Sequence, residues 1–169
     1  MTGTAVRPQI IEVAGGPSRS EPHVSMVLGY DRTPESRNAF DVTLDLGARL
    51  MAFLHVVHAI DLRDYPIDPD SADWEAKAAA TLAEERKIAT GLLRQYPWGW
   101  SYLAGRGDPA RLLMSVADDH DALMIVVGSK GEGLHVLVER LISPAVSHRL
   151  IERAKRPVLV VSRSRAWES

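Results

Sequence analysis

A glycine-rich tetrapeptide, Gly128-Ser129-Lys130-Gly131, has the residue types of this chain that are most typical of anion binding. It follows an unbroken apolar run at residues 123–127, which is short and rich in β-branched side chains and so predicts a buried strand. Glycine has no β-carbon, so its backbone N–H can approach a phosphate closely. A plain strand-to-helix turn would use the same residues. Taken alone, the stretch therefore favours a simple turn, with a phosphate-binding loop as the alternative.

Asp31 stands where a second apolar run, residues 24–30, comes to its end. Thr33 and Pro34 after it are typical of a helix start, with Thr33 as N-cap and Pro34 as the first helical residue. An aspartate here can close an Asx turn or present its carboxylate to a ligand. If the two strands are neighbours, Asp31 and Gly128 face each other across the crevice where doubly wound sheets bind ligands.

Two other groups of polar residues could hold a metal, and both fit structural roles better. His55 and His58 are three apart in a predicted strand, so they point to opposite faces and cannot share one ion. We expect one to pack against a helix and the other to make a hydrogen bond at the rim. The aspartates that precede residue 123 lack the spacing of calcium loops and predict solvated charge, at Asp118, Asp119 and Asp121.

The elements that must position these residues alternate along the chain. Apolar strand patterns at 24–30, 51–60, 98–103, 123–127 and 158–161 are separated by helical stretches. This order predicts an α/β fold, a doubly wound five-stranded parallel sheet with helices on both faces. Gly47 is predicted to end the first helix, and Asp108-Pro109 to start the third. Four alanines predict close packing of the second helix on the sheet, at Ala76, Ala79, Ala80 and Ala83.

Length and composition set the domain organisation. The 169 residues, 46% of them apolar, are enough for one domain, which we place at residues 23–163. Residues 1–22 contain Gly and Pro among Ser and Arg and predict a mobile N-terminal extension, with an added edge strand at residues 10–13 as the alternative. Residues 164–169 are a predicted C-terminal tail.

Charge and cysteine content exclude several classes of function. Without cysteine there is no disulfide framework, thiolate metal site or thiol nucleophile. The net charge of −2, with both signs interspersed, argues against a nucleic-acid partner. No apolar stretch approaches membrane-spanning length, and the N-terminus lacks the order of a signal peptide. A cytoplasmic protein is therefore expected.

Four motifs in the same order resemble the universal stress protein family: residues 30–36, Gly107-Asp108-Pro109-Ala110, residues 126–131 and the closing Pro157-Val158-Leu159-Val160-Val161. The resemblance covers about residues 24–162. It implies the adenine nucleotide alpha hydrolase-like strand order 3-2-1-4-5. It also implies an adenine nucleotide (ATP, ADP or AMP) across the crevice between the first and fourth strands. A further implication is a homodimer through the last strand, at Val158, Leu159, Val160 and Val161.

Carried over residue by residue, the resemblance places Asp31 beside the adenosine, with Ala59 and Val127 as contacts to adenine. It places three residues at the phosphates, Gly128, Ser129 and Gly131. Arg32 stands where the family usually has glycine, and its guanidinium could grip a phosphate. Lys130 and Ser143 could also supply groups to the phosphates.

The second half of the family's phosphate motif is altered. ATP-binding members have a second glycine followed by Ser or Thr nine residues after the equivalent of Gly131, where this chain has Leu141 and Ile142. Counting back from the final strand places Pro144 and Ala145 there instead, in a longer loop. Proline has no N–H and alanine has no hydroxyl, so both alignments predict a weakened phosphate site.

Two functions remain open from the sequence, with a third less favoured. The first is a nucleotide-binding module of the stress response, and the alternative is a dimeric scaffold that binds no ATP and acts through protein contacts with a client the sequence does not name. An enzyme would need a base or metal beside the phosphates, where Lys130, Glu132 and His135 are the available groups. Any ATP hydrolysis is therefore expected to be slow.

Overall fold

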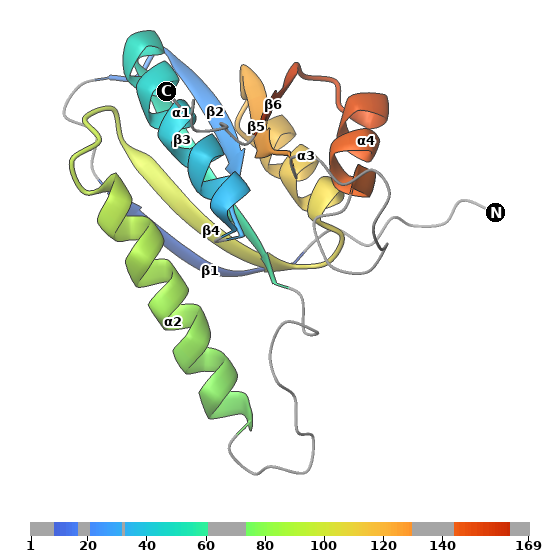
Figure 1. The fold of residues 1–169 in the computed structure, drawn as a ribbon. Helices are drawn as coiled ribbons and strands as arrows, with labels where there is room; N and C mark the ends of the chain where they lie inside the picture. The colour runs from blue at the N-terminus through green and yellow to red at the C-terminus, as the bar shows by residue number, and fades with distance from the viewer. Residues whose placement is uncertain (1–8, 17–20, 32, 61–73, 130–143, 163–169) are drawn as a thin grey trace, which may run out of the picture.

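The computed structural model describes residues 9–16, 21–31, 33–60, 74–129 and 144–162. They form one six-stranded sheet with helices on both faces (Figure 1). The elements in chain order are β1 (Gln9–Gly16), β2 (Val24–Gly29), α1 (Pro34–Leu50), β3 (Ala52–Ile60), α2 (Trp74–Leu93), β4 (Trp100–Arg106), α3 (Pro109–Asp119), β5 (Met124–Gly128), α4 (Pro144–Arg153) and β6 (Val158–Val161).

The sheet order is β1-β4-β3-β2-β5-β6, and every pair from β4 to β6 is parallel. This confirms the predicted order of the five parallel strands. β2 and β5 are direct neighbours, with Met26 opposite Met124 and Leu28 opposite Val126. The strand that precedes Asp31 and the strand that ends at Gly128 therefore finish side by side.

The sixth strand, β1, corrects the prediction for the N-terminal extension. Residues 9–16 pair antiparallel with β4, with Val13 opposite Leu103 and a bulge between Ile10 and Glu12. The expectation of an extension without an element of its own is wrong here, and the alternative of an added edge strand is the one observed. Too few apolar residues are present for a separate core, but a strand also gains backbone hydrogen bonds along the open edge of β4. The predicted tail at 164–169 lies outside the described residues.

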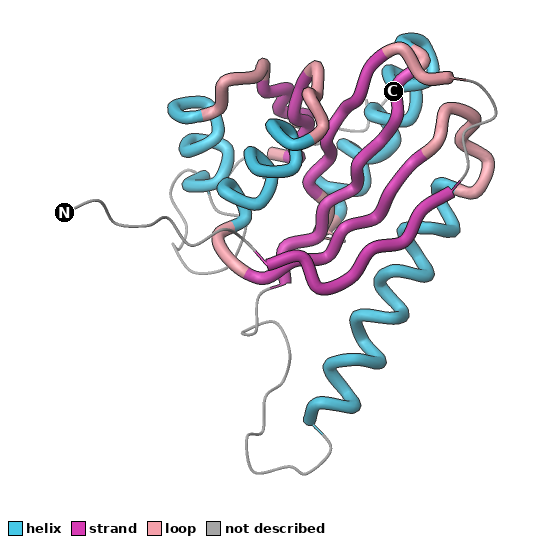
Figure 2. The backbone as a smooth tube through the Cα atoms, turned by 180° about the vertical axis from the view of Figure 1, so that it is seen from behind, coloured by secondary structure: helices cyan, strands magenta, loops and turns pink. Residues whose placement is uncertain are grey.

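Two apolar cores lie on the two faces of the sheet. Figures 1 and 2 show α1 and α2 on one face and α3 and α4 on the other. The alternation of side chains along each strand divides the buried residues between the faces. The first core includes Met26, Leu28, Leu54, Val56, Phe40 and Leu93. The second includes Val27, Val57, Ile125, Val127, Leu113 and Leu150.

The starts of α1 and α3 follow their sequence signals. Thr33 caps α1 by accepting the Ser36 N–H at 3.2 Å, and Asp108 caps α3 by accepting the Arg111 N–H at 3.0 Å. A proline occupies the first turn of each helix. Both helices begin at the edge of the sheet where the parallel strands end, so their N-termini point toward the same crevice.

The end of α1 differs from the prediction at Gly47. The helix continues past this residue to Leu50, and Met51 closes it in the left-handed region at φ 53°. Gly47 is buried, and a β-carbon there would lie 2.6 Å from the Tyr96 hydroxyl. The glycine therefore makes room for a neighbouring side chain and does not end the helix.

The alanine face of α2 is another correction. Ala79, Ala80 and Ala83 are exposed, so the prediction that they pack on the sheet is wrong. The helix buries residues of its second half, Glu85, Ala89 and Leu93. Figure 1 shows why, since α2 runs past the edge of the sheet and only part of its length lies over β1 and β4. No helix within the described ranges is both long and apolar enough to cross a membrane.

Candidate functional site

A crevice opens at the carboxyl ends of β2, β3 and β5, between the starts of α1 and α3. Its empty space is about 500 Å³, much of which is open to solvent. Residues from both sides of the sheet edge line it: Gly29, Tyr30, Asp31, Thr33, Glu35, Ser36, Val57, Ala59, Pro109, Leu113, Val127, Gly128 and Val146. As predicted, Asp31 and Gly128 share this crevice.

The turn between β2 and α1 forms one wall and is closed by its own side chains. Asp31 Oδ1 accepts the Thr33 N–H at 3.1 Å and the Thr33 hydroxyl at 2.6 Å, an Asx turn. The Ser36 hydroxyl donates to the Thr33 carbonyl at 3.0 Å and accepts the Asp31 N–H at 3.3 Å. Among the described residues, no donor reaches the second carboxylate oxygen of Asp31. One oxygen therefore fixes the turn, and the other can serve a ligand.

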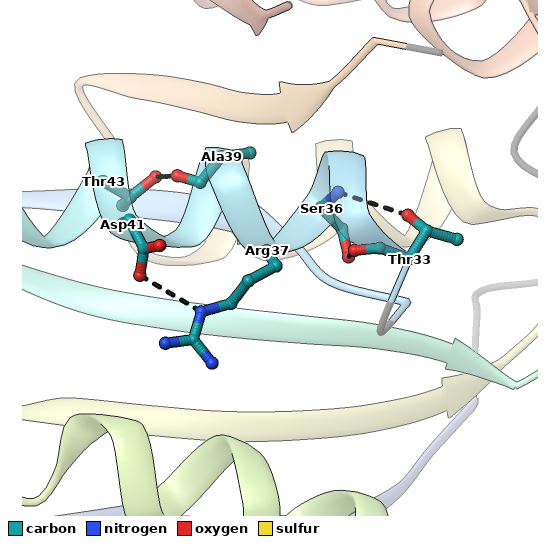
Figure 3. Close-up of polar contacts among 6 residues, drawn as sticks. All are labelled: Thr33, Ser36, Arg37, Ala39, Asp41 and Thr43. Atoms are coloured by element: carbon teal, nitrogen blue, oxygen red, sulfur yellow. Dashed lines mark hydrogen bonds and ion pairs between the residues drawn. The ribbon is translucent and has the colours of Figure 1, made fainter. Parts of the chain in front are cut away.

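Figure 3 shows the first turns of α1, where the Ser36 N–H donates to the Thr33 hydroxyl. In the same view the Arg37 guanidinium extends along the helix to Asp41, at 3.2 Å from Nε to Oδ1. This arginine is adjacent to a crevice residue in sequence, but its charge is directed to its own helix. It does not supply a cation to the crevice.

Gly128 forms the opposite wall and lies directly against the start of α1. A β-carbon at this position would lie 2.6 Å from the backbone carbonyl of Glu35 and 2.9 Å from the Ser36 nitrogen. Backbone atoms cannot move aside as the tip of a side chain can. The glycine therefore has a packing role, because it allows the two walls to lie in contact, and its role in phosphate binding stays a prediction.

Ser129, predicted at the phosphates, already uses its backbone N–H. That group donates to the Val161 carbonyl at 2.8 Å and extends the pairing of β5 with β6. The end of β6 is fixed in turn, because the Asn38 side chain donates to the Ser162 carbonyl at 2.7 Å. A contact from Ser129 to a phosphate would therefore come from its hydroxyl.

The base of the crevice is apolar, and its charges are of one sign. Five aliphatic side chains line it, from Val57, Ala59, Leu113, Val127 and Val146. Asp31 and Glu35 are the two acidic residues, and the described lining contains neither Lys nor Arg. An apolar slot with a carboxylate acceptor suits a flat base and its amino or hydroxyl donors. The same pair of carboxylates disfavours several phosphates.

A buried polar chain supports the crevice from the α2 side. His58 Nδ1 lies 3.0 Å from the Tyr30 carbonyl, and Nε2 lies 2.9 Å from Glu85 Oε2. A carbonyl can only accept, so Nδ1 carries the proton of its contact with Tyr30. Because Tyr30 precedes Asp31, this chain links α2 to the strand end that carries the carboxylate.

His55 lies on the other face of the sheet, which confirms the predicted divergence of the two histidines. Its Nδ1 is 2.8 Å from the Ser101 hydroxyl, and its ring stacks on His120 with centroids 3.9 Å apart. Burial, with a smaller effect of His120, lowers the pKa of His55 to about 4. Within the described residues no three His, Asp or Glu side chains gather as a metal-ligand set.

The structure brings together four of the predicted site residues, Asp31, Ala59, Val127 and Gly128, and places Ser129 beside them. The remaining four lie outside the described residues, namely Arg32, Lys130, Gly131 and Ser143. Sequence reasoning missed the lining from the helix starts, at Glu35, Pro109, Leu113 and Val146. The rule that ligands bind beyond strand ends could have assigned the first turns of these helices to the site.

Known proteins share the sequence pattern and the fold of this chain. The model of the universal stress protein family matches residues 25–162. The chain belongs to the universal stress protein family. A universal stress protein of Methanocaldococcus jannaschii is 25% identical over 143 residues, which are 82% of this chain and 81% of the relative.

Two solved structures show the same fold. A universal stress protein in complex with cAMP matches with a TM-score of 0.58 and 24% identity, over 85% of this chain and 100% of that one. A family protein of Arabidopsis thaliana with AMP bound matches with a TM-score of 0.56 and 16% identity, over 83% and 92% of the two chains. The ligands of those two proteins are cAMP and AMP, respectively.

Proposed function

We propose that this protein is an adenine-nucleotide-binding module of the stress response in which the phosphate end of the site is weakened. The observation that carries the proposal is the crevice between Asp31 and Gly128, with its apolar base and a carboxylate oxygen available to a ligand. The complexes of two family members with cAMP and AMP support adenine as the base.

The base and ribose end of the proposed site has the groups that such a ligand needs. Ala59 and Val127 offer apolar contact from β3 and β5, and Asp31 offers an acceptor for an N–H or O–H donor. Each hydrogen bond to a charged group contributes roughly 1.5–3 kcal/mol. Together with apolar burial this supports measurable adenosine binding.

The phosphate end of the proposed site is expected to contribute less to the binding free energy than the base and ribose end. The Ser129 N–H is committed to Val161, and α4 begins at Pro144, a residue without an N–H. Glu35 and Asp31 add negative charge to the same crevice. We expect AMP and ADP to bind about as tightly as ATP, because the outer phosphates gain few donors.

Calorimetric titration with adenosine, AMP, ADP, ATP and cyclic AMP tests this proposal. The half-buried Ala59 is changed to Leu to fill the slot, and the exposed Ala79→Leu on α2 is the matched control. Ala59→Leu is expected to lower every affinity by about tenfold or more, since the added carbons occupy the space of the base. Ala79→Leu should leave binding unchanged. ATP binding far tighter than AMP binding would show an intact phosphate site, and the absence of any adenine ligand binding would favour the scaffold function.

We also propose that the chain forms a homodimer through β6. This strand is at the edge of the sheet, and its four apolar residues are only half-buried, at Val158, Leu159, Val160 and Val161. An apolar edge strand favours pairing with another strand, and a two-fold axis makes such pairing self-complementary. The same edge supports the scaffold alternative, in which protein contacts are the activity.

Light scattering of Val160→Lys tests the dimer. A lysine in the middle of the pairing strand should shift the protein from dimer to monomer at micromolar concentration, because it brings two like charges together near the axis. Ile88→Lys, at an exposed apolar residue of α2, is the matched control and should keep the mass of the wild type. A monomeric wild type, or a Val160→Lys variant with unchanged mass, contradicts the proposal.

A further inference from the structure

The described crevice lining presents a charge problem for any phosphate ligand. It contains two carboxylates, those of Asp31 and Glu35, and neither Lys nor Arg among its described residues. Arg37, next in sequence to this lining, is paired with Asp41 along α1. A cation close to this lining would favour a phosphate ligand, because charge-assisted hydrogen bonds are the strong ones.

Arg149 of α4 occupies such a position. It follows Val146, which lines the crevice, by nearly one helical turn, so the two side chains lie on the same side of α4. Its Nη1 pairs with Asp108 Oδ2, and Asp108 directly precedes Pro109, another crevice residue. Figures 1 and 2 show α3 and α4 side by side at this place. The ion pair therefore stands at the α3–α4 edge of the crevice.

The two oxygens of Asp108 have separate partners. Oδ1 accepts the Arg111 N–H and caps α3, whereas Oδ2 pairs with Arg149. Both side chains of the pair are partly exposed, at 40% for Arg149 and 26% for Asp108, so water and ions can reach them. A dissolved phosphate can therefore compete with Asp108 for the guanidinium.

We propose that Arg149 is the phosphate-positioning residue of this crevice and that it exchanges the Asp108 carboxylate for a nucleotide phosphate on binding. The inference rests on the proposed nucleotide site and adds the group that compensates for the altered loop. A planar guanidinium suits two oxygens of one phosphate, as it suits a carboxylate. Asp108 then acts as a competitor that holds Arg149 at the edge of the crevice when no phosphate is present.

A double-mutant cycle on Arg149 and Asp108 tests the exchange, with adenosine, AMP and ATP as probes. Arg149→Gln should lower the affinities for AMP and ATP by about tenfold and leave that for adenosine within about twofold. Asp108→Asn keeps an oxygen for the cap of α3 and removes the competing charge, so it should raise AMP and ATP affinity by about threefold or more. In the Arg149→Gln background this gain should disappear.

Arg37→Gln is the matched control, because it removes the same charge from another Arg–Asp pair whose guanidinium is directed away from the crevice. Thermal unfolding identifies any variant that is not folded, and Arg149→Lys should recover part of the AMP affinity. Equal losses for Arg149→Gln and Arg37→Gln, a parallel loss of adenosine binding, or an Asp108→Asn gain that persists without Arg149 would overturn the inference while the proposed function stands. A wild type that binds neither adenosine nor nucleotides overturns both.

Discussion

The two ends of the parallel sheet both concentrate polar side chains, but they arrange them differently. At the end opposite the crevice, polar groups pair across elements: Arg156 contacts Asp121 at 2.8 Å, and Tyr96 donates to the Ala52 carbonyl at 2.5 Å. At the crevice end, Asp31 and Thr33 close on their own turn and leave space beside them. The pairs at the opposite end join segments of the fold, as the Arg149–Asp108 pair does near the crevice, whereas the turn of Asp31 is closed locally beside an open site.

The difference between bridging pairs and a locally closed turn indicates where a ligand can bind without breaking contacts of the fold. A group that bridges two elements cannot turn to a ligand unless the bridge is replaced. Asp31 has one oxygen engaged in a local turn, so its other oxygen can bind a ligand while the backbone stays in place. The turn of Asp31 is therefore the part of the crevice that can bind a ligand without a change in the backbone.

The largest expected effect comes from Gly128→Ala, which breaks the contact between the crevice walls. The new β-carbon would lie 2.6 Å from the Glu35 backbone, so α1 or β5 must shift. We expect a loss of about 3 kcal/mol in the free energy of unfolding and a fall in Tm of roughly 10 °C. Adenosine binding should fall as well, because the crevice loses its shape.

Gly91→Ala is the matched control for this prediction. Gly91 lies in α2 with open space around its α-carbon, and alanine favours the helix there by up to about 1 kcal/mol. Thermal and urea unfolding of the two variants should therefore give opposite signs. A Gly128→Ala protein as stable as the wild type would show that the walls are not held together by this glycine.

Much of the crevice end could be predicted from the sequence because its signals are local. Thr33-Pro34 and Asp108-Pro109 specify helix starts through one side-chain oxygen and one fixed φ angle, and both are observed. The apolar runs specify buried strands, and a right-handed crossover between parallel strands leaves few topologies. The meeting of Asp31 and Gly128 follows from the predicted adjacency of two strands.

The incorrect predictions concern residues whose role depends on a segment far away in the sequence. Gly47 was interpreted as a helix end, yet its role depends on Tyr96, far away in sequence. The alanines of α2 were assigned to the sheet, but how much of a helix lies over a sheet depends on the width of the sheet and on the helix's direction. The Ser129 N–H was assigned to phosphate, although β6 accepts it. None of these partners is encoded in the local pattern.

At the end of the sheet opposite the crevice, the stacked pair of His55 and His120 is expected to make the stability of the protein depend on pH. The pKa of His55 is lowered to about 4 by burial and by its neighbour, whereas an unfolded histidine titrates near 6.5. Below pH 6.5 the unfolded chain therefore binds a proton that the folded chain does not. Stability from this group is complete above pH 6.5 and declines as the pH falls toward 4, by up to about 3 kcal/mol.

Urea unfolding between pH 7 and 4 measures this effect. His55→Gln keeps a polar group for the Ser101 hydroxyl but cannot titrate, so its free energy of unfolding should change less over the same range. All other titratable groups are the same in both proteins, so their contributions cancel in the comparison. Parallel pH profiles for the variant and the wild type would contradict the assignment to His55.

The smallest expected effect, and the most specific to the crevice, is that of Asp31→Asn. Asparagine can still accept the Thr33 N–H and hydroxyl through one oxygen, so the turn and the stability of α1 should be kept. The second oxygen becomes an amide nitrogen, which cannot accept a donor from the ligand. Adenosine affinity should therefore fall by about tenfold. ATP affinity should fall less, since the same change removes a negative charge that repels the phosphates.

The control is Asp41→Asn, which changes an exposed carboxylate on α1 and should alter neither affinity. If calorimetry instead gives equal losses for adenosine and ATP, Asp31 acts through the turn alone and the two ends of the sheet are less different than their geometry indicates.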